Sequence, residues 1–440
     1  MKHFRKSLSA ILVTAAIAAS VFVPAMAAGA YTPIAGPTTN FSKYLVLDAE
    51  ATVPNVTMTF TLAAGSPVAA SAGKIPVYAG NDAARVALKT GATSQTVDAA
   101  IAAAVGTAVF APTDNNTAVS GGITKTVSTT DSTTTIAADS DTSKKHVVKT
   151  VDINLSELTF SEPGVYRYVL EENNPSDTAV SKDTTKKTLD VYVQDATTTS
   201  GKALEIAGCV MYNGTISTAP TAGATAAKAA LGTKDNTFVN NYDSYNLTVS
   251  KTVTGNQGSR DEYFKITVVL DGVVSGNTYT VDITHADNPT STNAINTEPH
   301  NNPSSLTSTS TSLSQDFWLQ SGQSIVIQGI GKGVSYTVTE DYATASAEGY
   351  SVSAEVTGDT TDVTNSAASD GSVTDTSLEA DTAVAYTNDK QGVIPTGVLL
   401  SATPVIIVGV VVIAGIVFLA VRSAKRKAME AAEAEADSEQ

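Results

Sequence analysis

The sequence predicts an all-β protein with two tandem β-sandwich domains, and three observations support this fold class. Short segments that alternate apolar and polar residues recur along the chain, with turn-forming residues between them. Thr, Ser, Val, Ala and Asn dominate the composition, and the β-branched residues among them favour strands. The stretch between the two chain ends is too long for one ordinary domain but sufficient for two, each with its own core.

The first domain is expected over residues 28–242. Alternating apolar residues predict strands, in chain order, at 41–47, 56–62, 147–155, 165–172, 189–194, 204–212 and 238–242. Glu162-Pro163-Gly164 predicts a turn before the fourth of these strands. Residues 64–145 are rich in Ala, Gly, Ser and Thr, so we expect a long surface insertion there, with one helical piece at 96–105.

The second domain is expected over residues 243–390, after the short linker Asp243-Ser244-Tyr245. Strands are predicted at 247–253, 263–270, 278–283, 324–327, 335–340, 350–356 and 383–388. We expect a polar loop between Ile283 and Leu313, and we expect Trp318 to pack at the edge of the core. Short strands at regular spacing are typical of a sandwich.

Lysine, glutamate and asparagine occur twice, in that order, on the apolar faces of predicted strands. Strand side chains alternate between faces, so residues of the same parity share a face. Asn241 competes with Asn240, but its parity turns it away from Phe238. Because Lys and Glu are almost never fully buried unless they are paired, each set is a candidate site. The two sets are Lys43, Glu172 and Asn240 in the first domain, and Lys251, Glu340 and Asn388 in the second.

A buried lysine beside a buried glutamate and an asparagine amide can form a covalent bond. Burial lowers the pKa of the lysine and raises the pKa of the glutamate, so both groups move toward their neutral forms. The neutral amine is a nucleophile, and the protonated glutamate can polarise the asparagine carbonyl and transfer protons as ammonia leaves. The product would be a Lys–Asn amide, formed once and without turnover. Its formation requires the first and last strands of each domain to be neighbours.

Each of these residues also has an ordinary explanation when taken alone. A lysine at a strand start can extend to water, a glutamate can end a strand, and asparagine is common in turns. Two sets in the same order, each bracketing one domain, favour the crosslink. The sequence contains no nucleophile elbow, P-loop, dinucleotide fingerprint or H-E-x-x-H motif, so we expect no turnover enzyme.

Residues 1–27 have the parts of a secretory signal peptide. Lys2, Arg5 and Lys6 supply the positive charge, and residues 10–23 supply the apolar segment. Pro24-Ala25-Met26-Ala27 then ends in the small-x-small pattern that signal peptidase cuts. We therefore expect cleavage after Ala27 and export of the chain.

Residues 398–421 form a 24-residue stretch without a charge, long enough to cross a bilayer. Basic residues follow at once, so we expect the tail 422–440 to be cytoplasmic. The segment 391–397 precedes this stretch and ends in Ile394-Pro395-Thr396-Gly397, which in this position resembles a sortase sorting signal. In such signals the residue matching Thr396 is captured as an acyl-enzyme and the residue matching Gly397 leaves. The motif departs from the common L-P-x-T-G form and is closer to the shorter x-V-P-T-G variants, with Ile394 in place of Val. The alternative reading of this region is a plain type I membrane protein.

Composition and charge exclude several classes of partner and cofactor. The net charge of −16 and the pI of about 4.6 argue against nucleic acid as a partner. Cys209 is the only cysteine, so an intramolecular disulfide is impossible, and we expect it to be a small core residue. The four histidines are scattered and lack the spacing of metal ligands. We expect no metal and no cofactor.

Six segments together resemble the backbone, or shaft, pilins of Gram-positive sortase-assembled pili. They span nearly the whole mature chain and are 41–45, 162–172, 238–240, 247–251, 336–340 and 386–388. The resemblance implies immunoglobulin-like sandwiches, the second similar to the B-type repeat of collagen-binding surface proteins. It also implies that amide bonds join Lys43 to Asn240 and Lys251 to Asn388, with Glu172 and Glu340 assisting.

The same resemblance implies polymerisation, in which an exposed lysine of the next subunit attacks the acyl-enzyme at Thr396. In such proteins this lysine lies shortly before the closing strand of the first domain, so Lys234 is the preferred candidate and Lys228 the alternative. The expected partners are a sortase, other copies of the chain, minor pilus subunits and cell-wall peptidoglycan. The expected location is the pilus at the surface of a Gram-positive bacterium, after a transient membrane-bound precursor.

Other functions stay open at this point. If Lys234 and Lys228 are ordinary surface lysines, the chain would be a terminal, wall-anchored subunit. A monomeric wall-anchored adhesin would bind a host or environmental ligand through the loops at 64–145 or 284–313. A soluble enzyme has the least support.

Overall fold

The computed structural model describes most of residues 31–393. The described residues are 31, 34–69, 73–80, 105–128, 133–156, 158–160, 162–197, 203–220, 231–285 and 302–393. Contacts divide the chain into two units, Met1–Gln391 and Gly392–Gln440, and all the described strands belong to the first. Within the described part of the chain, no helix has the length and apolar character needed to cross a membrane.

Several predicted segments lie outside the described residues. They are the signal peptide (1–27), most of the helical piece at 96–105, Lys228, the motif 394–397, the apolar stretch 398–421 and the tail 422–440.

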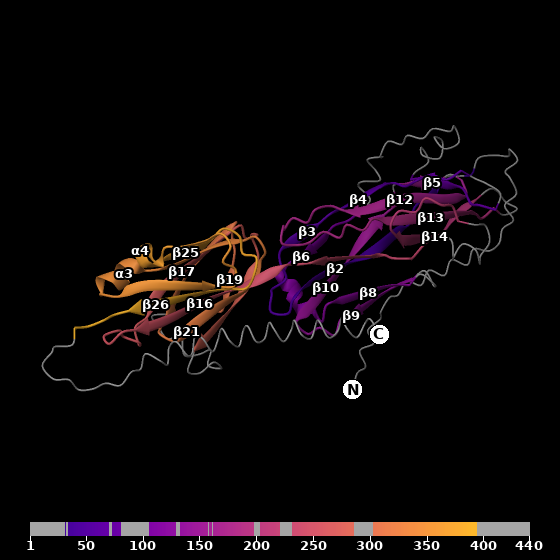
Figure 1. Cartoon of the computed structure of the whole chain (residues 1–440). Coiled ribbons are helices and arrows are strands. Elements are labelled where there is room, and N and C mark those ends of the chain that lie inside the picture. Colours follow the sequence, from indigo (N-terminus) through magenta and orange to yellow (C-terminus); the bar gives the residue numbers. More distant parts are fainter. Residues whose placement is uncertain are drawn as a thin grey trace. The chain divides into compact units, whose positions relative to one another are not determined.

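The first sandwich packs a four-stranded sheet against a five-stranded sheet (Figure 1). The first sheet has the strand order β15-β2-β10-β7, with β2 at Thr38–Asp48, β7 at Val119–Ser120, β10 at Lys144–Asn154 and β15 at Thr237–Asn241. The second sheet has the order β14-β13-β12-β4, with β5 pairing β12, and its strands are β4 at Phe60–Ala64, β5 at Val77–Ala79, β12 at Gly164–Glu172, β13 at Lys187–Asp195 and β14 at Leu204–Asn213.

Three smaller strand pairs and one short helix complete this sandwich. The pairs are β1 (Ile34–Ala35) with β11 (Thr159–Phe160), β3 (Val56–Met58) with β6 (Ala108–Phe110), and β8 (Ile123–Ser128) with β9 (Thr133–Ala138). The helix is the 3-10 turn η1 at Pro112–Thr117.

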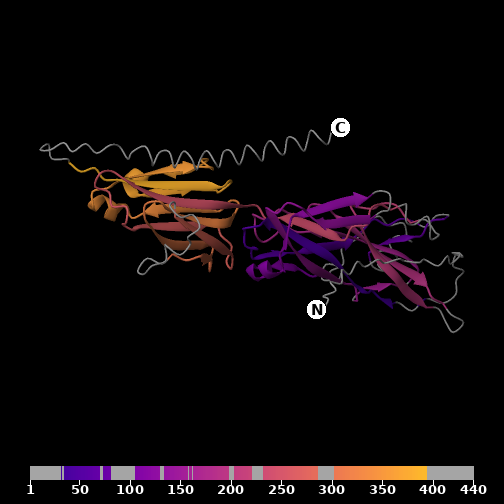
Figure 2. The same ribbon diagram turned by 90° about the horizontal axis from the view of Figure 1, so that it is seen from below.

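The second sandwich has a six-stranded and a five-stranded sheet, and both layers can also be followed in Figure 2. The first sheet has the order β19-β18-β21-β16-β26-β23, with β16 at Ser244–Thr254, β18 at Thr278–His285, β19 at Ser305–Thr307, β21 at Gln323–Gly331, β23 at Ser351–Thr357 and β26 at Thr382–Asp389. The other has the order β20-β17-β22-β25-β24, with β17 at Phe264–Asp271, β20 at Ser312–Leu319, β22 at Ser335–Glu340, β24 at Val363–Asn365 and β25 at Ser372–Asp375.

Each sandwich has its own hydrophobic core, so the predicted all-β class with two sandwiches is confirmed. In β16 the burial alternates strictly from Leu247 to Val253, because one face packs on the core and the other does not. In both sandwiches the first long strand lies parallel to the last one: β2 pairs β15, and β16 pairs β26. A parallel pair of this kind joins the two ends of a domain directly.

The described part of the expected insertion at 64–145 is more ordered than predicted. It contains β5, β6, η1, β7, the β8–β9 hairpin and the first residues of β10. The hairpin was missed because most of its residues are Thr, Ser and Ala and none of its side chains is buried, so no run of alternating apolar residues marks it.

The polar loop expected between Ile283 and Leu313 also contains structure. Ser305–Thr307 forms β19 against β18, and β20 begins at Ser312. The prediction also missed β24, β25 and two short helices, α3 at Tyr342–Ala347 and α4 at Ala367–Asp370. Trp318 lies in β20 and is half-buried.

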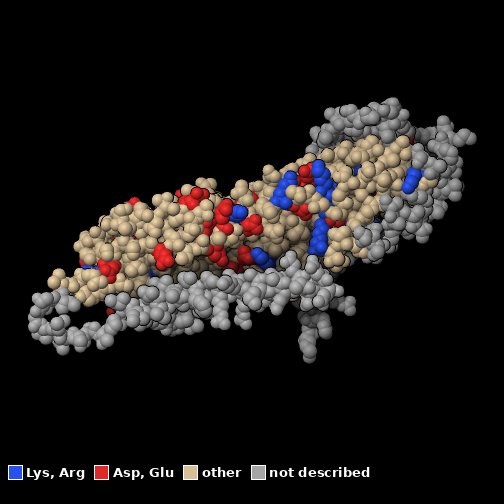
Figure 3. Space-filling model, in the orientation of Figure 1, with Lys and Arg blue, Asp and Glu red and all other residues tan. Residues whose placement is uncertain are grey.

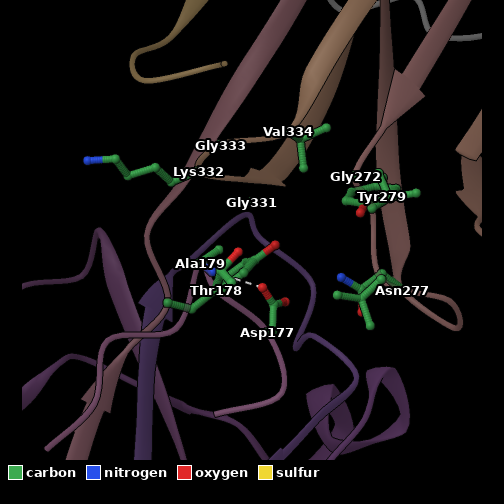
Figure 4. A pocket seen from close by; sticks show the side chains of 13 residues that line it. Asp177, Thr178, Ala179, Gly272, Asn277, Tyr279, Gly331, Lys332, Gly333 and Val334 are labelled. Atoms are coloured by element: carbon green, nitrogen blue, oxygen red, sulfur yellow. Dashed lines mark hydrogen bonds between the residues drawn. The ribbon is translucent and has the colours of Figure 1, made fainter. Parts of the chain in front are cut away.

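A small pocket lies within the first unit, lined by Asp177, Tyr242, Asn277 and Lys332 among others (Figure 4). Burial raises the pKa of the Asp177 carboxyl, and its Oδ1 accepts a hydrogen bond from the main-chain N–H of Ala179 at 2.9 Å. On the face shown in Figure 3, Lys and Arg lie in small groups next to Asp and Glu, without a broad basic patch.

Candidate functional site

The structure brings Lys43, Glu172 and Asn240 together in the core of the first sandwich, and we call this the first site. Lys43 lies in the middle of β2, and Asn240 lies on β15, which pairs with β2 so that Lys43 is opposite Phe238 and Asn240 is opposite Leu45. Glu172 is the last residue of β12 in the facing sheet. All three side chains are 0% exposed, so the site joins two layers of the sandwich out of contact with water.

The first site is a closed ring of hydrogen bonds. Lys43 Nζ donates to Glu172 Oε2 at 2.7 Å and to Asn240 Oδ1 at 2.5 Å. Asn240 Nδ2 donates to Glu172 Oε1 at 2.5 Å. The carboxyl group of Glu172 therefore contacts the lysine nitrogen with one oxygen and the asparagine amide nitrogen with the other.

Aromatic rings enclose this ring of polar groups. Phe41, Phe60 and Phe238 contact each other edge to face or tilted, and Lys43 Nζ lies 5.8 Å from the centroid of Phe238. Such surroundings disfavour charge on both members of the pair. Burial lowers the pKa of the Lys43 amine and raises the pKa of the Glu172 carboxyl, although their mutual attraction opposes both shifts.

Lys251, Glu340 and Asn388 form the second site, with the same plan. Lys251 lies on β16 and Asn388 on the parallel strand β26, and again the lysine is opposite the residue two positions before the asparagine. Glu340 is the last residue of β22 in the facing sheet. The exposed fractions of the three residues are 1%, 1% and 0% in that order.

The hydrogen bonds of the second site differ in detail. Lys251 Nζ donates to both carboxylate oxygens of Glu340 at 2.7 Å, and Asn388 Nδ2 donates to Glu340 Oε1 at 2.5 Å. Burial lowers the pKa of Lys251 to about 8. Lys251 Nζ lies 4.3 Å from the centroid of the Phe264 ring.

Asn240 also has a partner that the sequence analysis did not identify. The main-chain N–H of Asp183 donates to Asn240 Oδ1 at 2.9 Å. Asp183 lies in the connection between β12 and β13, and its carboxylate accepts a hydrogen bond from the Val239 N–H at 3.0 Å. A main-chain contact of this kind leaves no signal in the residue types.

Asn241, the rival of Asn240, does not reach the site. Its side chain is exposed, and its main-chain carbonyl accepts a hydrogen bond from the Ser181 N–H at 2.8 Å. Lys234 is half-buried and lies beside the edge of β14, in an isolated bridge with Tyr212.

Two buried ion pairs in the first sandwich were also missed. Arg167 donates to both carboxylate oxygens of Asp190 at 2.7 Å, and Lys187 pairs with Asp235. Arg167 has the parity opposite to that of Tyr166 and Tyr168, yet all three are buried. A second apolar cluster, which includes Val77, Val165 and Ala219, covers the outer face of this sheet, so alternation does not mark its inner face.

These two ion pairs differ from the candidate sites. Asp235 Oδ2 also accepts from Lys125 Nζ at 2.6 Å, and its pKa is lowered because the hydrogen bonds and charges of the two lysines outweigh its burial. A carboxylate held in the charged form cannot protonate a leaving group. Cys209 is half-buried against the core, and burial raises the pKa of its thiol to about 12.

Comparisons with known proteins agree with this architecture. Residues 111–243 match the family described as a Spy0128-like isopeptide containing domain, and residues 245–390 match a domain of unknown function (DUF7601). A pilin from Streptococcus pyogenes serotype M1 is 29% identical over 278 residues, which cover 61% of this chain and 71% of the pilin. The pilus tip adhesin Cpa from Streptococcus pyogenes is 30% identical over 156 residues, which cover 35% of this chain and 18% of the adhesin.

A solved structure supports the same fold. A crystal structure of the major pilin from Streptococcus pyogenes, in a mutant form, matches with a TM-score of 0.50 and 21% identity, covering 81% of this chain and all of the pilin chain. At this level of identity the match establishes the fold alone. Residues 111–243 thus match a Spy0128-like isopeptide containing domain, and the chain is similar in sequence and in fold to pilins of Streptococcus pyogenes.

Proposed function

We propose that the chain is the structural subunit of a covalently polymerised surface pilus, held together internally by one Lys–Asn amide bond in each sandwich. The observation that carries this proposal is the repetition of one plan. Each sandwich places a buried lysine, glutamate and asparagine on its first strand, its facing sheet and its last strand. The match to an isopeptide-containing domain supports the same chemistry in the first sandwich.

In the first site the reaction needs no group beyond the three side chains. The neutral Nζ of Lys43 attacks Cγ of Asn240, which forms the new N–C bond. Glu172 accepts the proton that Nζ loses and delivers a proton to Nδ2, so the Cγ–Nδ2 bond breaks and ammonia leaves. Contacts of 2.7 Å and 2.5 Å from the two carboxyl oxygens to these nitrogens support such a proton transfer.

The crosslink in the second sandwich would carry mechanical load. Because it would join the first strand of that sandwich to its last strand, a force applied between Lys234 and Thr396 would pass through the bond. The strands between would then bear little tension. The parallel pair β16–β26 supports this path.

Polymerisation would join Thr396 of one copy to a lysine of the next, through a sortase. Lys234 is the preferred candidate for that lysine, and it lies within the described residues. Its neighbours are held to the edge of β14, since Asp235 N–H donates to the Met211 carbonyl at 2.9 Å and Asn213 N–H donates to the Thr233 carbonyl at 2.8 Å. The last subunit would be transferred to cell-wall peptidoglycan, and other pilus subunits would be further partners.

The adhesin alternative has less support. The adhesin that matches this chain does so over only 18% of its own length, whereas the pilin matches over 71% of its length. A ligand that binds the loops at 64–145 or 284–313 would be an additional property of a pilus subunit.

The mass of the unreduced, denatured full chain tests the crosslinks. We expect a mass lower by two ammonia molecules than the sequence predicts, and a deficit of one ammonia in Glu172→Ala or Glu340→Ala. Lys149→Ala is the matched control, since Lys149 lies opposite Lys43 on β10 but outside the site. The full calculated mass in a folded sample would contradict the crosslinks.

A sortase reaction in vitro tests the polymerisation lysine. We expect a ladder of covalent multimers with the unaltered chain and none with Lys234→Arg. Lys186→Arg, which alters a side chain that is 50% exposed, should leave the ladder intact. A ladder that persists in Lys234→Arg would assign the linkage to another lysine.

A further inference from the structure

The two sites differ at the oxygen atom on which negative charge would develop. When an amine attacks a carboxamide, the carbonyl oxygen becomes an oxyanion in the transition state, and a fixed N–H donor stabilises it. In the first site Asn240 Oδ1 accepts from the Asp183 N–H at 2.9 Å. In the second site, within the described part of the chain, the buried Oδ1 of Asn388 has no hydrogen-bond partner.

Sheet topology explains this difference. β15 is the edge strand of its sheet, so a non-strand segment can approach its free side. β26 has β16 on one side and β23 on the other, with Val352 of β23 opposite Asn388. The main-chain N–H groups beside β26 belong to neighbouring strands, whereas the segment beside β15 can direct one N–H to a side chain.

The segment that carries Asp183 is fastened to β15 on both sides of Asn240. Ser181 N–H donates to the Asn241 carbonyl at 2.8 Å, and Asn241 N–H donates to Ser181 Oγ at 2.9 Å. The Asp183 carboxylate accepts the Val239 N–H at 3.0 Å with one oxygen and the Thr185 N–H at 2.9 Å with the other. These bonds hold the Asp183 N–H in place before the reaction, as an oxyanion donor requires.

We propose that the Asp183 main-chain N–H is the oxyanion donor for crosslinking in the first sandwich, and that the second sandwich crosslinks more slowly because its described residues supply no equivalent donor. The inference rests on the proposed crosslinks. In the step, the Nζ–Cγ bond forms as the C=O electron pair moves onto Oδ1, where the N–H stabilises it. The pair returns as Cγ–Nδ2 breaks, and the nitrogen leaves as ammonia with the proton that Glu172 transferred.

Two substitutions at one position separate the main-chain donor from the side chain. Asp183→Pro removes the N–H and the carboxylate, while Asp183→Ala removes the carboxylate alone. The full chain is made by cell-free synthesis in a Lys251→Ala background, where only the first site can react. Samples are quenched in acid at intervals, and the loss of one ammonia is followed by intact mass.

Removal of one oxyanion donor slows acyl transfer by about 100-fold or more, so we expect that decrease in Asp183→Pro relative to Asp183→Ala. Equal crosslinking rates in the two variants would overturn the proposal when a thermal unfolding transition shows that both variants are folded. If Asp183→Pro does not fold, the proposal is tested by comparing two single variants, Lys251→Ala and Lys43→Ala, that keep Asp183. Lys251→Ala reports the first site and Lys43→Ala reports the second, and we expect the first to react at least about tenfold faster.

A second site that reacts as fast as the first, or faster, would overturn the proposal in that comparison. Failure of the proposed function gives a different result, because neither chain would then lose ammonia at any time. The rates therefore test the donor, and the final masses test the crosslinks.

Discussion

Replacement of Lys43 by methionine should destabilise the first sandwich by the full contribution of its crosslink. The change removes the nucleophile but keeps an apolar stem of similar length among Phe41, Phe60 and Phe238. Burial raises the pKa of the Glu172 carboxyl, which favours its neutral form, and the carboxyl keeps its hydrogen bond from Asn240. The substitution therefore removes the buried amine without leaving Glu172 free of hydrogen bonds.

The magnitude follows from the loop that the bond would close. Lys43 and Asn240 are 197 positions apart, and the chain-entropy model gives about 5 kcal/mol for a crosslink over a loop of that length. For a domain of this size, each kcal/mol moves the thermal midpoint by roughly 2–4 °C, so Lys43→Met should lower it by about 10–20 °C.

Calorimetry of the full chain at pH 6 measures this shift, and intact mass confirms that one ammonia deficit is lost. Lys149→Met is the control, because it removes a lysine from the neighbouring position on β10 without affecting a crosslink. A shift below about 3 °C in a chain whose mass shows that the bond is absent would refute the entropic argument.

Three further predictions concern other buried groups. Burial lowers the pKa of Lys251 to about 8 from its ordinary 10.5. Between these two pH values the folded chain therefore binds fewer protons than the unfolded chain, and its stability rises with pH. In Asn388→Ala, where Lys251 stays a free amine, the free energy of unfolding should rise by about 2 kcal/mol from pH 8 to 9.5. Urea titrations measure it, and the rise should vanish in Asn388→Ala/Lys251→Met. Asp190→Ala should lower the free energy of unfolding in urea by about 3–5 kcal/mol, because the Arg167 charge is left buried without its carboxylate partner. The double variant Arg167→Met/Asp190→Leu should restore most of this stability. Equal stability of the two variants would contradict the prediction. Because burial raises the pKa of the Cys209 thiol to about 12, a thiol reagent at pH 8 should label the folded chain far more slowly than the unfolded one, and equal labelling rates would show that the thiol is accessible.

Alternation in the sequence was informative wherever one face of a strand is buried and the other is not. β16 and β22 alternate in this way, and the residues that share parity with Lys251 and Glu340 lie in the core. The same rule gave no signal for Arg167, Asp190 and Lys187, because the first part of β12 and most of β13 are buried on both faces. It also gave no signal for the β8–β9 hairpin, in which no side chain is buried.

The sequence by itself determined the all-β class, the two sandwiches and the residue types capable of crosslinking, because these depend on local alternation and on side-chain chemistry. Only the tertiary structure decided which strands are neighbours, with Lys43 opposite Phe238 and Lys251 opposite Tyr386. It also decided that the Asp183 N–H contacts Asn240, while the oxygen of Asn388 has no such donor within the described residues. Strand order and the approach of a main-chain N–H arise from contacts between segments far apart in the chain, and those contacts leave no periodic mark in the sequence.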